Sequence, residues 1–366
     1  MQETHENRRS TITAIVLLGI LVGVAVWRSG GYSPSGLVLH RYEGQMIMST
    51  PQFNILATLP ATMPAAQRDA MCRNADAAAH WVEGEMNIYN PQSPLSKFNT
   101  AQPGDYPLDA KMVEVLGLSH AVWEKSGGAF DVTARPLIGL WKASLKAGNV
   151  PSDAARKAAR DKSHWDDFTL SASGASVGKR RASACFDLGG VAKGYAIDLA
   201  VKSLQVQGAI GGMVDIGGDV RCFGRKPDGK LWRMGLADPY HPHAIYLNAS
   251  GAIVILGLGD EAVCTSGDYA RGEEIKGRRY SHIVNPATLN ATTKSPSVTV
   301  IAPDAATADA WATALSVLGP AGLEKLKGTK VEAMILMGDT EETTVYHATD
   351  NFERRFLMDM KYPKAK

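Results

Sequence analysis

The chain has 366 residues, of which 45% are hydrophobic and 21% are charged. This composition is that of a folded globular protein, and it excludes a mainly disordered, collagen-like or multi-span membrane chain. The 39 basic residues nearly balance the 37 acidic ones without a long basic run, so no nucleic-acid partner is expected. The four cysteines form no CxxC pair, so the sequence indicates neither a zinc cage nor a redox motif.

The N-terminus carries an apolar segment at residues 11–28, after a short polar stretch at 1–10 that contains Arg8 and Arg9. Its length is at the short end of what spans a bilayer as a helix. Arginines before the segment favour a cytoplasmic N-terminus, which places the rest of the chain across the membrane. We expect a single-pass anchor in a bacterial inner membrane, with a cleaved signal sequence as the alternative. The chain beyond it would face the periplasm or the cell exterior, after a linker at 29–36.

Residues 37–366 have the pattern of one folded domain without internal repeats. In chain order we predict two strands within 37–59, helices at 63–87, 111–126 and 154–162, a hairpin at 168–186 turning at Ser173 and Gly174, and a helix at 191–205. Strands follow at 213–223, 231–237, 244–247, 252–256 and 297–302, and a helix at 306–318 ends at Gly319 and Pro320. Strands interrupted by helices without regular βαβ alternation predict an α+β fold with largely antiparallel sheets.

A glycine turn lies at the start of the predicted helix at 191–205, within DLGGVAKGYAID at residues 187–198. Backbone N–H groups at a helix start favour a phosphate, and Lys193 adds a positive charge. The segment matches neither GxxxxGK[ST] nor GxGxxG, and a Gly-Gly turn also serves close packing alone. Two further clusters, at 217–219 and 265–268, could also present N–H groups or hydroxyls to an anion.

Asp309 and Thr313 lie four residues apart in the predicted helix at 306–318 and therefore share one face. A carboxylate and a hydroxyl are hard oxygen donors of the kind that Mg²⁺ takes. The alternative is a solvated Asp309 beside a threonine that fills the core. The alanine-rich surroundings favour the metal site, because small residues let a large ligand lie close to the helix.

His282 lies in YSHIVNP at residues 280–286, before a proline turn. A general base that works near neutral pH is most often a histidine. A structural or surface role for this histidine remains the alternative.

Several motifs, in this order along the chain, resemble signatures of the ApbE family of flavin transferases, the FAD:protein FMN transferases. The resemblance covers residues 46–319 and rests on SPLSKFN (93–99), GAFDVTARPLIGLW (128–141), DLGGVAKGYAID (187–198), VDIGGD (214–219), TSGDYAR (265–271), HIVNP (282–286) and SVTVIAPDAATADAWATALSVLG (297–319). It implies a T-fold-like architecture that binds FAD and Mg²⁺. It also implies transfer of FMN through a phosphoester bond to a threonine of an acceptor flavoprotein, with release of AMP.

The resemblance also assigns roles to individual residues. It implies that Gly190, Asp309 and Thr313 hold Mg²⁺ and that His282 deprotonates the acceptor hydroxyl. The residues that it implies for contact with FAD are Met48, Tyr89, Ala129, Phe130, Asp131, Asp187, Lys193, Ser266 and Ile283. The acceptor is expected to be a subunit of a membrane electron-transfer complex with a Ser/Thr-Gly-Ala-Thr-like motif. The stretch SGAS at 173–176 is similar to that motif but falls at a predicted turn, where Ser and Gly are common.

Some positions depart from the family pattern. Ser49 stands where the family usually has Gly, and Asn285, Ala287 and Leu289 stand where it usually has Asp, Arg or Lys, and Gly. Lys142 and Ala143 follow Trp141 where Gly-Phe is frequent. Two other functions are compatible with these changes: an FAD pyrophosphatase that yields FMN and AMP, and an accessory protein that binds FAD without catalysis.

Overall fold

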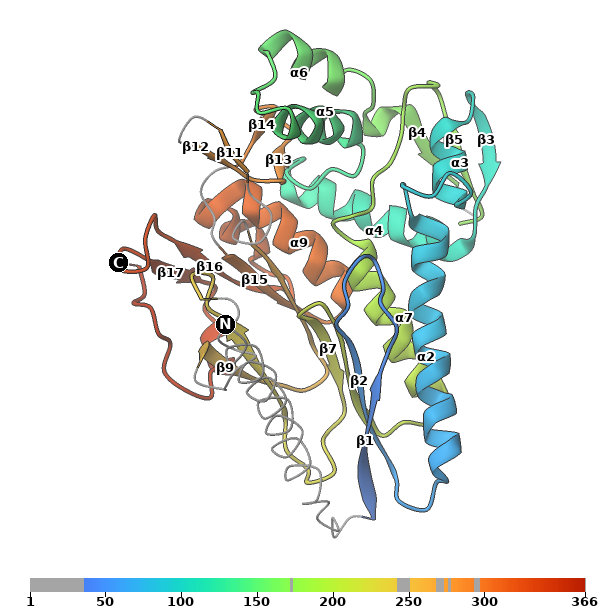
Figure 1. The fold of residues 1–366 in the computed structure, drawn as a ribbon, viewed down its shortest axis with the longest axis vertical. Coiled ribbons are helices and arrows are strands. Elements are labelled where there is room, and N and C mark those ends of the chain that lie inside the picture. Colours follow the sequence, from blue (N-terminus) through green and yellow to red (C-terminus); the bar gives the residue numbers. More distant parts are fainter. Residues whose placement is uncertain are drawn as a thin grey trace, which may run out of the picture.

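The computed structural model describes residues 36–171, 174–241, 251–267, 273–275, 278–292 and 297–365. Within these residues an eight-stranded antiparallel sheet runs through the molecule (Figure 1). Its strands, in order across the sheet, are β1 (Leu37–Glu43), β2 (Phe53–Pro60), β6 (Gly211–Ile216), β7 (Asp219–Phe223), β10 (Ala262–Ser266), β15 (Ser297–Ala302), β16 (Glu332–Met337) and β17 (Val345–Ala348). The predicted α+β class with largely antiparallel sheets is confirmed.

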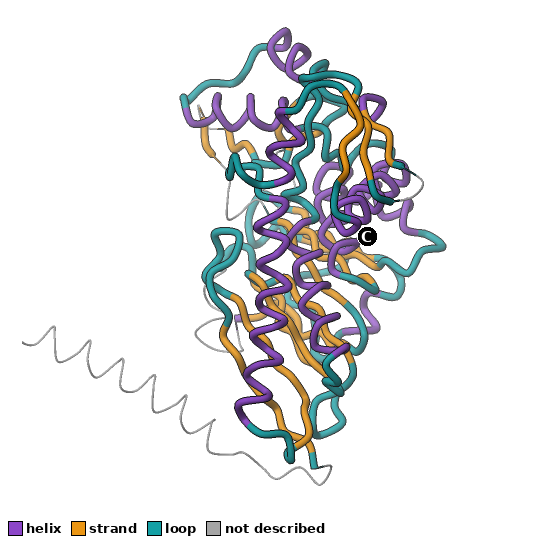
Figure 2. Tube along the Cα trace, turned by 90° about the vertical axis from the view of Figure 1, so that its right-hand side faces the viewer, coloured by secondary structure: helices purple, strands orange, loops and turns teal. Residues whose placement is uncertain are grey.

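One face of the sheet is covered by helices. They are α2 (Ala65–Met86), α7 (Ala192–Val206) and α9 (Ala305–Leu318), and α4 (Ala110–Ser126) packs against α9. Alternate side chains of β2 point into this layer, and Phe53, Ile55 and Leu59 are at most 2% exposed, as the period of two of a strand requires. Figure 2 shows α2 and α7 lying side by side along the sheet.

A second core fills the other face of the sheet. The hairpin of β8 (Trp232–Ala237) and β9 (Ala252–Leu258) and a 3₁₀ turn at Phe352–Arg355 contribute to it. The side chains of Trp232 and Phe352 are almost fully buried there. The strands in the middle of the sheet, from β6 to β16, are therefore largely buried on both faces, whereas no residue of the edge strand β1 is fully buried.

A smaller lobe stands beyond one end of the helical layer, at the top of Figure 1. It contains the three-stranded sheet of β3 (Gly104–Pro107), β5 (Ser176–Lys179) and β4 (Phe168–Leu170), together with α3 (Pro94–Thr100), α5 (Arg135–Lys146), α6 (Asp153–Arg160) and the short pairs β11 (Glu273–Ile275) with β12 (Arg278–Tyr280) and β13 (Val284–Asn285) with β14 (Asn290–Ala291). A third apolar cluster around Leu137 and Trp141 joins α5 to β13 and β14.

Most of the predicted helices are confirmed within two residues, and α4 ends at Gly127 with a left-handed φ of 70°. One predicted strand and one predicted hairpin are wrong in extent. The segment 213–223 is a hairpin, because Gly217 and Gly218 both have positive φ and reverse the chain between β6 and β7. The predicted hairpin at 168–186 ends at Lys179, and the residues that follow do not pair with β4.

The predicted anchor at 11–28, the strand at 244–247 and Ser173 lie outside the described residues. Within the described residues, no helix has the length and hydropathy needed to cross a membrane. All four cysteines fall inside the described part of the chain, and each is a free thiol.

The helices α7 and α9 approach each other unusually closely. Gly194 of α7 faces Ala305 of α9, and a Cβ atom added to Gly194 would lie 2.2 Å from the Ala305 carbonyl oxygen. The Gly194 amide donates a hydrogen bond of 3.1 Å to Asp309. One turn further along α7, the carboxylate of Asp198 accepts the Ala305 and Ala306 amides. These contacts set the register of the two helices.

We predict that Gly194→Ala separates the two helices, because the Ala305 backbone cannot move aside without shifting α9. The free energy of unfolding should fall by about 1–3 kcal/mol, as for other overpacked cores, which urea denaturation measures. Gly117→Ala in α4 is the matched control, because a Cβ there meets nothing within 4 Å. Equal stability of the Gly194→Ala variant and the parent would show that the close approach is not required.

Candidate active site

The glycine turn before α7 meets α9 at the residues predicted to bind a metal. A Cβ atom on Gly190 would lie 3.0 Å from the Thr313 hydroxyl oxygen and 3.2 Å from the Phe130 ring. Asp309 lies one turn before Thr313 on α9, and its side chain reaches the start of α7 at Gly194. The fold therefore brings Gly190, Asp309 and Thr313 together.

Buried charges surround this point. Lys193 forms an ion pair with Asp219, whose side chain is 3% exposed. Burial raises the pKa of Asp309, and so does the nearby charge of Asp219, while Lys193 opposes both. Burial lowers the pKa of Lys193, but Asp219 and Asp309 outweigh it and raise that pKa above its ordinary value. The three groups carry one more negative than positive charge when ionised.

This arrangement fits a divalent cation. Asp309 is 6% exposed, and among the described residues the Gly194 amide is the one hydrogen-bond donor to its carboxylate. The Thr313 hydroxyl has no hydrogen-bond partner within the same part of the chain, and it lies beside Gly190. A buried carboxylate with spare oxygen lone pairs and an adjacent hydroxyl is a suitable donor set for Mg²⁺.

The predicted FAD contacts at residues 129–131 adjoin the same turn. The Asp187 amide donates to the Val132 carbonyl at 2.7 Å, which ties this segment to the start of the glycine turn. The Asp131 carboxylate is already occupied within the protein: it accepts two hydrogen bonds from Thr133 and an ion pair from Arg160 at 2.7 Å. The segment can therefore offer its backbone, Ala129 and the edge of Phe130 to a ligand, rather than a free carboxylate.

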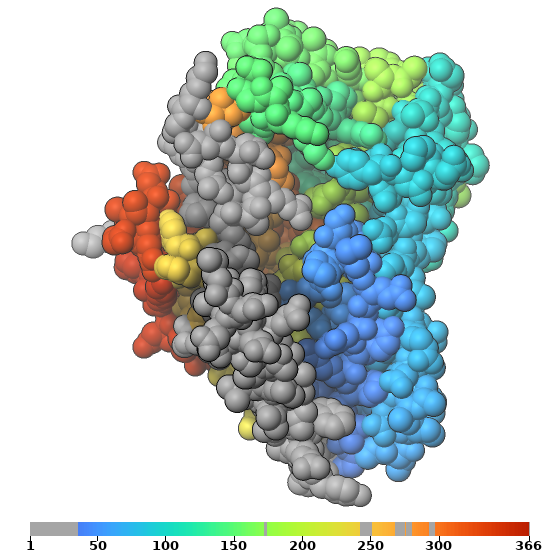
Figure 3. Space-filling view, in the orientation of Figure 1, coloured from blue at the N-terminus to red at the C-terminus, as the bar shows by residue number. Residues whose placement is uncertain are grey.

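Met48 lies in a tight turn between β1 and β2, the blue segment on the face drawn in Figure 3. Ile47 and Thr50 exchange backbone hydrogen bonds of 2.8 and 3.1 Å, and the two residues between them, Met48 and Ser49, have φ of 49° and 62°. Such a two-residue turn needs positive φ at both central positions. The turn stands next to Gly217, where a Cβ would lie 2.9 Å from the Thr50 hydroxyl.

Tyr89 and His282 lie in the smaller lobe and are connected through α5. The Lys142 ammonium lies 4.9 Å from the centre of the Tyr89 ring and donates to its hydroxyl at 3.2 Å, while Tyr89 itself is 75% exposed. The neighbouring Trp141 donates to the Leu289 carbonyl at 2.9 Å, in the turn that follows His282. His282 is exposed between the buried Ser281 and Ile283, so its neighbours anchor the backbone on both sides of it.

The altered residues in the turn after His282 fit it unequally. Asn285 accepts the Ala287 and Thr288 amides at 2.9 and 3.1 Å, which an aspartate oxygen would do equally well. Leu289 has φ of 61°, a conformation that favours the glycine usual in the family.

Ser266, which is predicted to contact FAD, is the last residue of β10. The amide of the preceding Thr265 donates a hydrogen bond of 2.9 Å to the Asp219 carboxylate.

One part of the reasoning on Asp309 is wrong. The alanines of α9 do not face a ligand, because Ala305, Ala306, Ala308, Ala310, Ala312 and Ala314 are at most 1% exposed and pack inside the protein. They let α9 lie close to α7 and the sheet. The sequence analysis did not predict that Asp219 and Asp198 belong to this site. Both lie in the motifs quoted above: Asp219 directly follows Gly218, and Asp198 comes four residues after Gly194.

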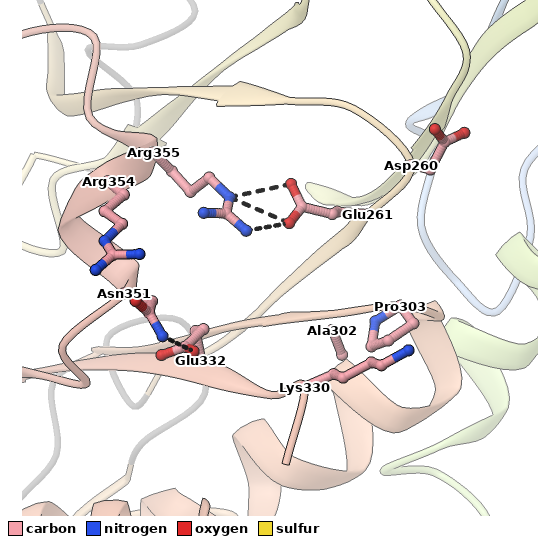
Figure 4. A pocket seen from close by; sticks show the side chains of 9 residues that line it. All are labelled: Asp260, Glu261, Ala302, Pro303, Lys330, Glu332, Asn351, Arg354 and Arg355. Carbon is pink, nitrogen blue, oxygen red and sulfur yellow. Dashed lines mark hydrogen bonds and ion pairs between the residues drawn. The ribbon is translucent and has the colours of Figure 1, made fainter. Parts of the chain in front are cut away.

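A separate cavity of about 480 Å³ lies at the other end of β10 and β15 (Figure 4). Its lining residues are Asp260, Glu261, Ala302, Pro303, Lys330, Glu332, Asn351, Arg354 and Arg355. Arg355 forms a two-point ion pair with Glu261, and Asn351 donates to Glu332 at 3.1 Å. None of the predicted site residues lines this cavity.

Comparisons with known proteins identify the fold and its relatives. A model of the ApbE family matches residues 53–335. A relative from Klebsiella pneumoniae (strain 342), named FAD:protein FMN transferase, is 33% identical over 243 residues, covering 64% of this chain and 67% of the relative. A Vibrio cholerae protein of the same name is 30% identical over 277 residues, covering 74% of this chain and 80% of the relative.

Solved structures are similar over nearly the whole described domain. The Pseudomonas stutzeri flavinyl transferase ApbE, in its apo form, has a TM-score of 0.76 at 26% identity, covering 88% of this chain and 98% of its own. The flavin transferase ApbE from Vibrio cholerae has a TM-score of 0.72 at 26% identity, covering 88% of this chain and 99% of its own.

We predict that Ser49→Gly stabilises the protein. The left-handed backbone at Ser49 strains a residue with a side chain but not glycine, and after the larger chain entropy of glycine the gain should be about 0.5–1 kcal/mol. Thermal unfolding measures it. Ser49→Ala is the control and should bring no gain, because alanine keeps the same strain. A Ser49→Gly variant no more stable than Ser49→Ala would contradict the strained turn.

Proposed function

This chain belongs to the ApbE family and is an FAD:protein FMN transferase, and we propose that it moves FMN from FAD onto a threonine hydroxyl of an acceptor flavoprotein, with release of AMP. The observation that carries the proposal is the register of α7 on α9, which sets Asp309 and Thr313 against the Gly190 turn. Such a turn, with a carboxylate and a hydroxyl at its side, suits a pyrophosphate and its metal ion.

In this proposal the residues around the glycine turn bind and orient FAD. Asp309 and Thr313 would hold Mg²⁺, with the backbone at Gly190 close by. Bound there, Mg²⁺ supplies positive charge that offsets the charge developing on the pyrophosphate. Lys193 is also proposed to contact the FAD, and its ammonium group is at the same time paired with Asp219.

The reaction itself is a displacement at phosphorus. The acceptor hydroxyl oxygen forms a bond to the phosphorus of the FMN half, the bridging P–O bond breaks, and AMP leaves with the bond's electron pair. His282 takes the proton of the hydroxyl, because an exposed imidazole on an anchored turn can meet an incoming protein chain. Met48, Tyr89, Asp187, Ser266, Ile283 and residues 129–131 are proposed to contact the FAD.

We also propose that residues 11–28 anchor the protein in the bacterial inner membrane, with the catalytic domain facing the periplasm or the cell exterior. Leu37 pairs with Pro60, at the end of the β1–β2 hairpin away from the Met48 turn. The seven residues of β1 separate these two ends by roughly 20 Å. A tether leaving at Leu37 therefore leaves the Met48 end free to meet an acceptor, proposed to be a subunit of a membrane electron-transfer complex.

The direct test is acceptor labelling. The full chain is incubated with FAD, Mg²⁺ and an acceptor domain that carries a Ser/Thr-Gly-Ala-Thr-like motif, and flavin fluorescence of the acceptor is read on a denaturing gel. We expect a fluorescent acceptor with Mg²⁺ and none with EDTA. Free FMN and AMP without a labelled acceptor would instead indicate a pyrophosphatase, and FAD binding without either product would indicate an accessory protein.

Two variants separate the proposed roles in the same assay. Asp309→Asn keeps an oxygen for the Gly194 amide but loses the charge, so labelling should fall at least tenfold and extra Mg²⁺ should not stabilise the fold. His282→Ala should keep FAD affinity and lose labelling. Full labelling by Asp309→Asn would contradict the metal site.

A further inference from the structure

The Met48 turn is held by side chains from one face of α2. Asp76, His80 and Glu83 follow one another at helical spacing, so their side chains point the same way. Each binds a different backbone group of the turn. The Gln45 amide donates to Asp76 at 3.3 Å, the His80 ring contacts the Met46 carbonyl at 3.3 Å, and the Met48 amide donates to Glu83 at 2.9 Å.

The chain approaches α2 closely enough for these bonds because of Gly44. A Cβ atom there would lie 2.6 Å from the Phe53 ring and 3.1 Å from an Asp76 oxygen. Tyr42 of β1 adds a hydroxyl hydrogen bond to the same Asp76 at 3.1 Å. The segment that leads into the turn, from Tyr42 to Met48, is therefore fastened to α2. The two central residues of the turn stay in a backbone conformation that they would not adopt readily alone.

Both ring nitrogens of His80 face acceptors. Nδ1 lies 2.5 Å from the Asp76 carboxylate and 3.0 Å from the Asp76 carbonyl, and Nε2 faces the Met46 carbonyl. A neutral imidazole carries one N–H and can donate on one side alone, whereas the imidazolium donates on both. The other neighbours are the Phe53 ring of β2, Tyr42 acting through Asp76, and Glu83 one turn further along α2.

We propose that Asp76, His80 and Glu83 are positioning residues that keep the Met48 turn in the conformation that binds FAD. His80 makes its contacts with both Asp76 and Met46 as a donor only while it is an imidazolium. The proposal rests on the proposed function in one respect, that Met48 contacts FAD. The hydrogen bonds that fasten the turn join groups of the protein itself. They can therefore be tested separately.

The pH dependence has a definite sign. Burial lowers the pKa of His80, but the backbone contacts and the Asp76 charge outweigh it and raise that pKa above its ordinary 6.5. A raised pKa in the folded protein means that the contribution of His80 is complete below 6.5 and is lost as the pH rises through the folded value. FAD affinity should weaken over that same interval.

The first experiment uses Glu83 and reads the turn directly. In the full chain without ligand, Glu83→Ala should speed hydrogen exchange in the peptide that contains Met48 roughly tenfold, the loss expected for one bond to a charged acceptor. Glu83→Gln, whose amide oxygen can still accept from Met48, should restore slow exchange. Glu85→Ala is the matched control, because Glu85 makes no hydrogen bond or ion pair with the described residues. Wild-type exchange in Glu83→Ala would overturn the proposal.

The second experiment measures FAD function in the same variants. Glu83→Ala should raise the KM for FAD roughly tenfold while kcat changes little, and Glu83→Gln should remain near the parent value. FAD binding by the parent should weaken as the pH rises above 6.5 through the raised pKa of His80, and His80→Gln should flatten this dependence, because glutamine donates to Met46 without titrating. An unchanged pH profile in His80→Gln would overturn the role of its charge. If no variant and no parent binds FAD, the proposed function fails, whereas the exchange result still decides the positioning.

Discussion

The close contact of α7 with α9 at Gly194 is the constraint on which the site depends. Only a residue without a Cβ lets the Ala305 carbonyl approach so closely. That approach lets the Gly194 amide reach Asp309 and puts Gly190 against Thr313. The glycines of this motif thus serve packing, and the same register that buries α9 brings together the oxygen donors that we propose for the metal ion.

The carboxylates near this contact differ in the hydrogen bonds and ion pairs that stabilise their negative charge. Asp198 accepts two amides at the start of α9 and pairs with Arg221 at 2.6 Å, although burial still raises its pKa to about 6. Asp219 pairs with Lys193 and accepts the Thr265 amide. Asp309 has one amide within the described residues. It is the member of the group whose charge is least compensated by the protein, and so the one suited to a metal ion.

The sequence predicted the helices well, and also that Asp309 and Thr313 share one face of α9, because these signals are local. The role of the two residues as metal ligands stays a prediction. Gly127 and Gly319 end their helices, and the four-residue spacing of Asp309 and Thr313 shows by itself that they share a face. The helix α5 was not predicted as a helix, since Gly139 interrupts it and only Leu137 and Trp141 of its residues are fully buried. The strands β16 and β17 were missed for another reason: β16 joins the sheet through a long-range pairing with β15, and β17 then pairs with β16 at the edge of the sheet.

Other features could not be read from residue types. Gly217 and Gly218 read as part of one strand until their positive φ angles reveal a reversal. The ion pair of Lys193 with Asp219 joins residues from different motifs. The hydrogen bond from the Met48 amide to Glu83 of α2 also joins segments that are far apart in the sequence. The alanines of α9 suggested room for a ligand, but their burial depends on which elements surround the helix. Such properties arise from packing between distant segments.

The central claim is that the α7–α9 register creates the metal and pyrophosphate site. A crystal structure of the full chain with FAD and Mn²⁺ in place of Mg²⁺ tests it most directly, because the anomalous signal of Mn²⁺ locates the ion independently of the refined coordinates. The account predicts a peak in contact with the Asp309 carboxylate and the Thr313 hydroxyl, beside Gly190 and against the FAD pyrophosphate. A peak elsewhere, or a pyrophosphate bound away from the glycine turn, would contradict it.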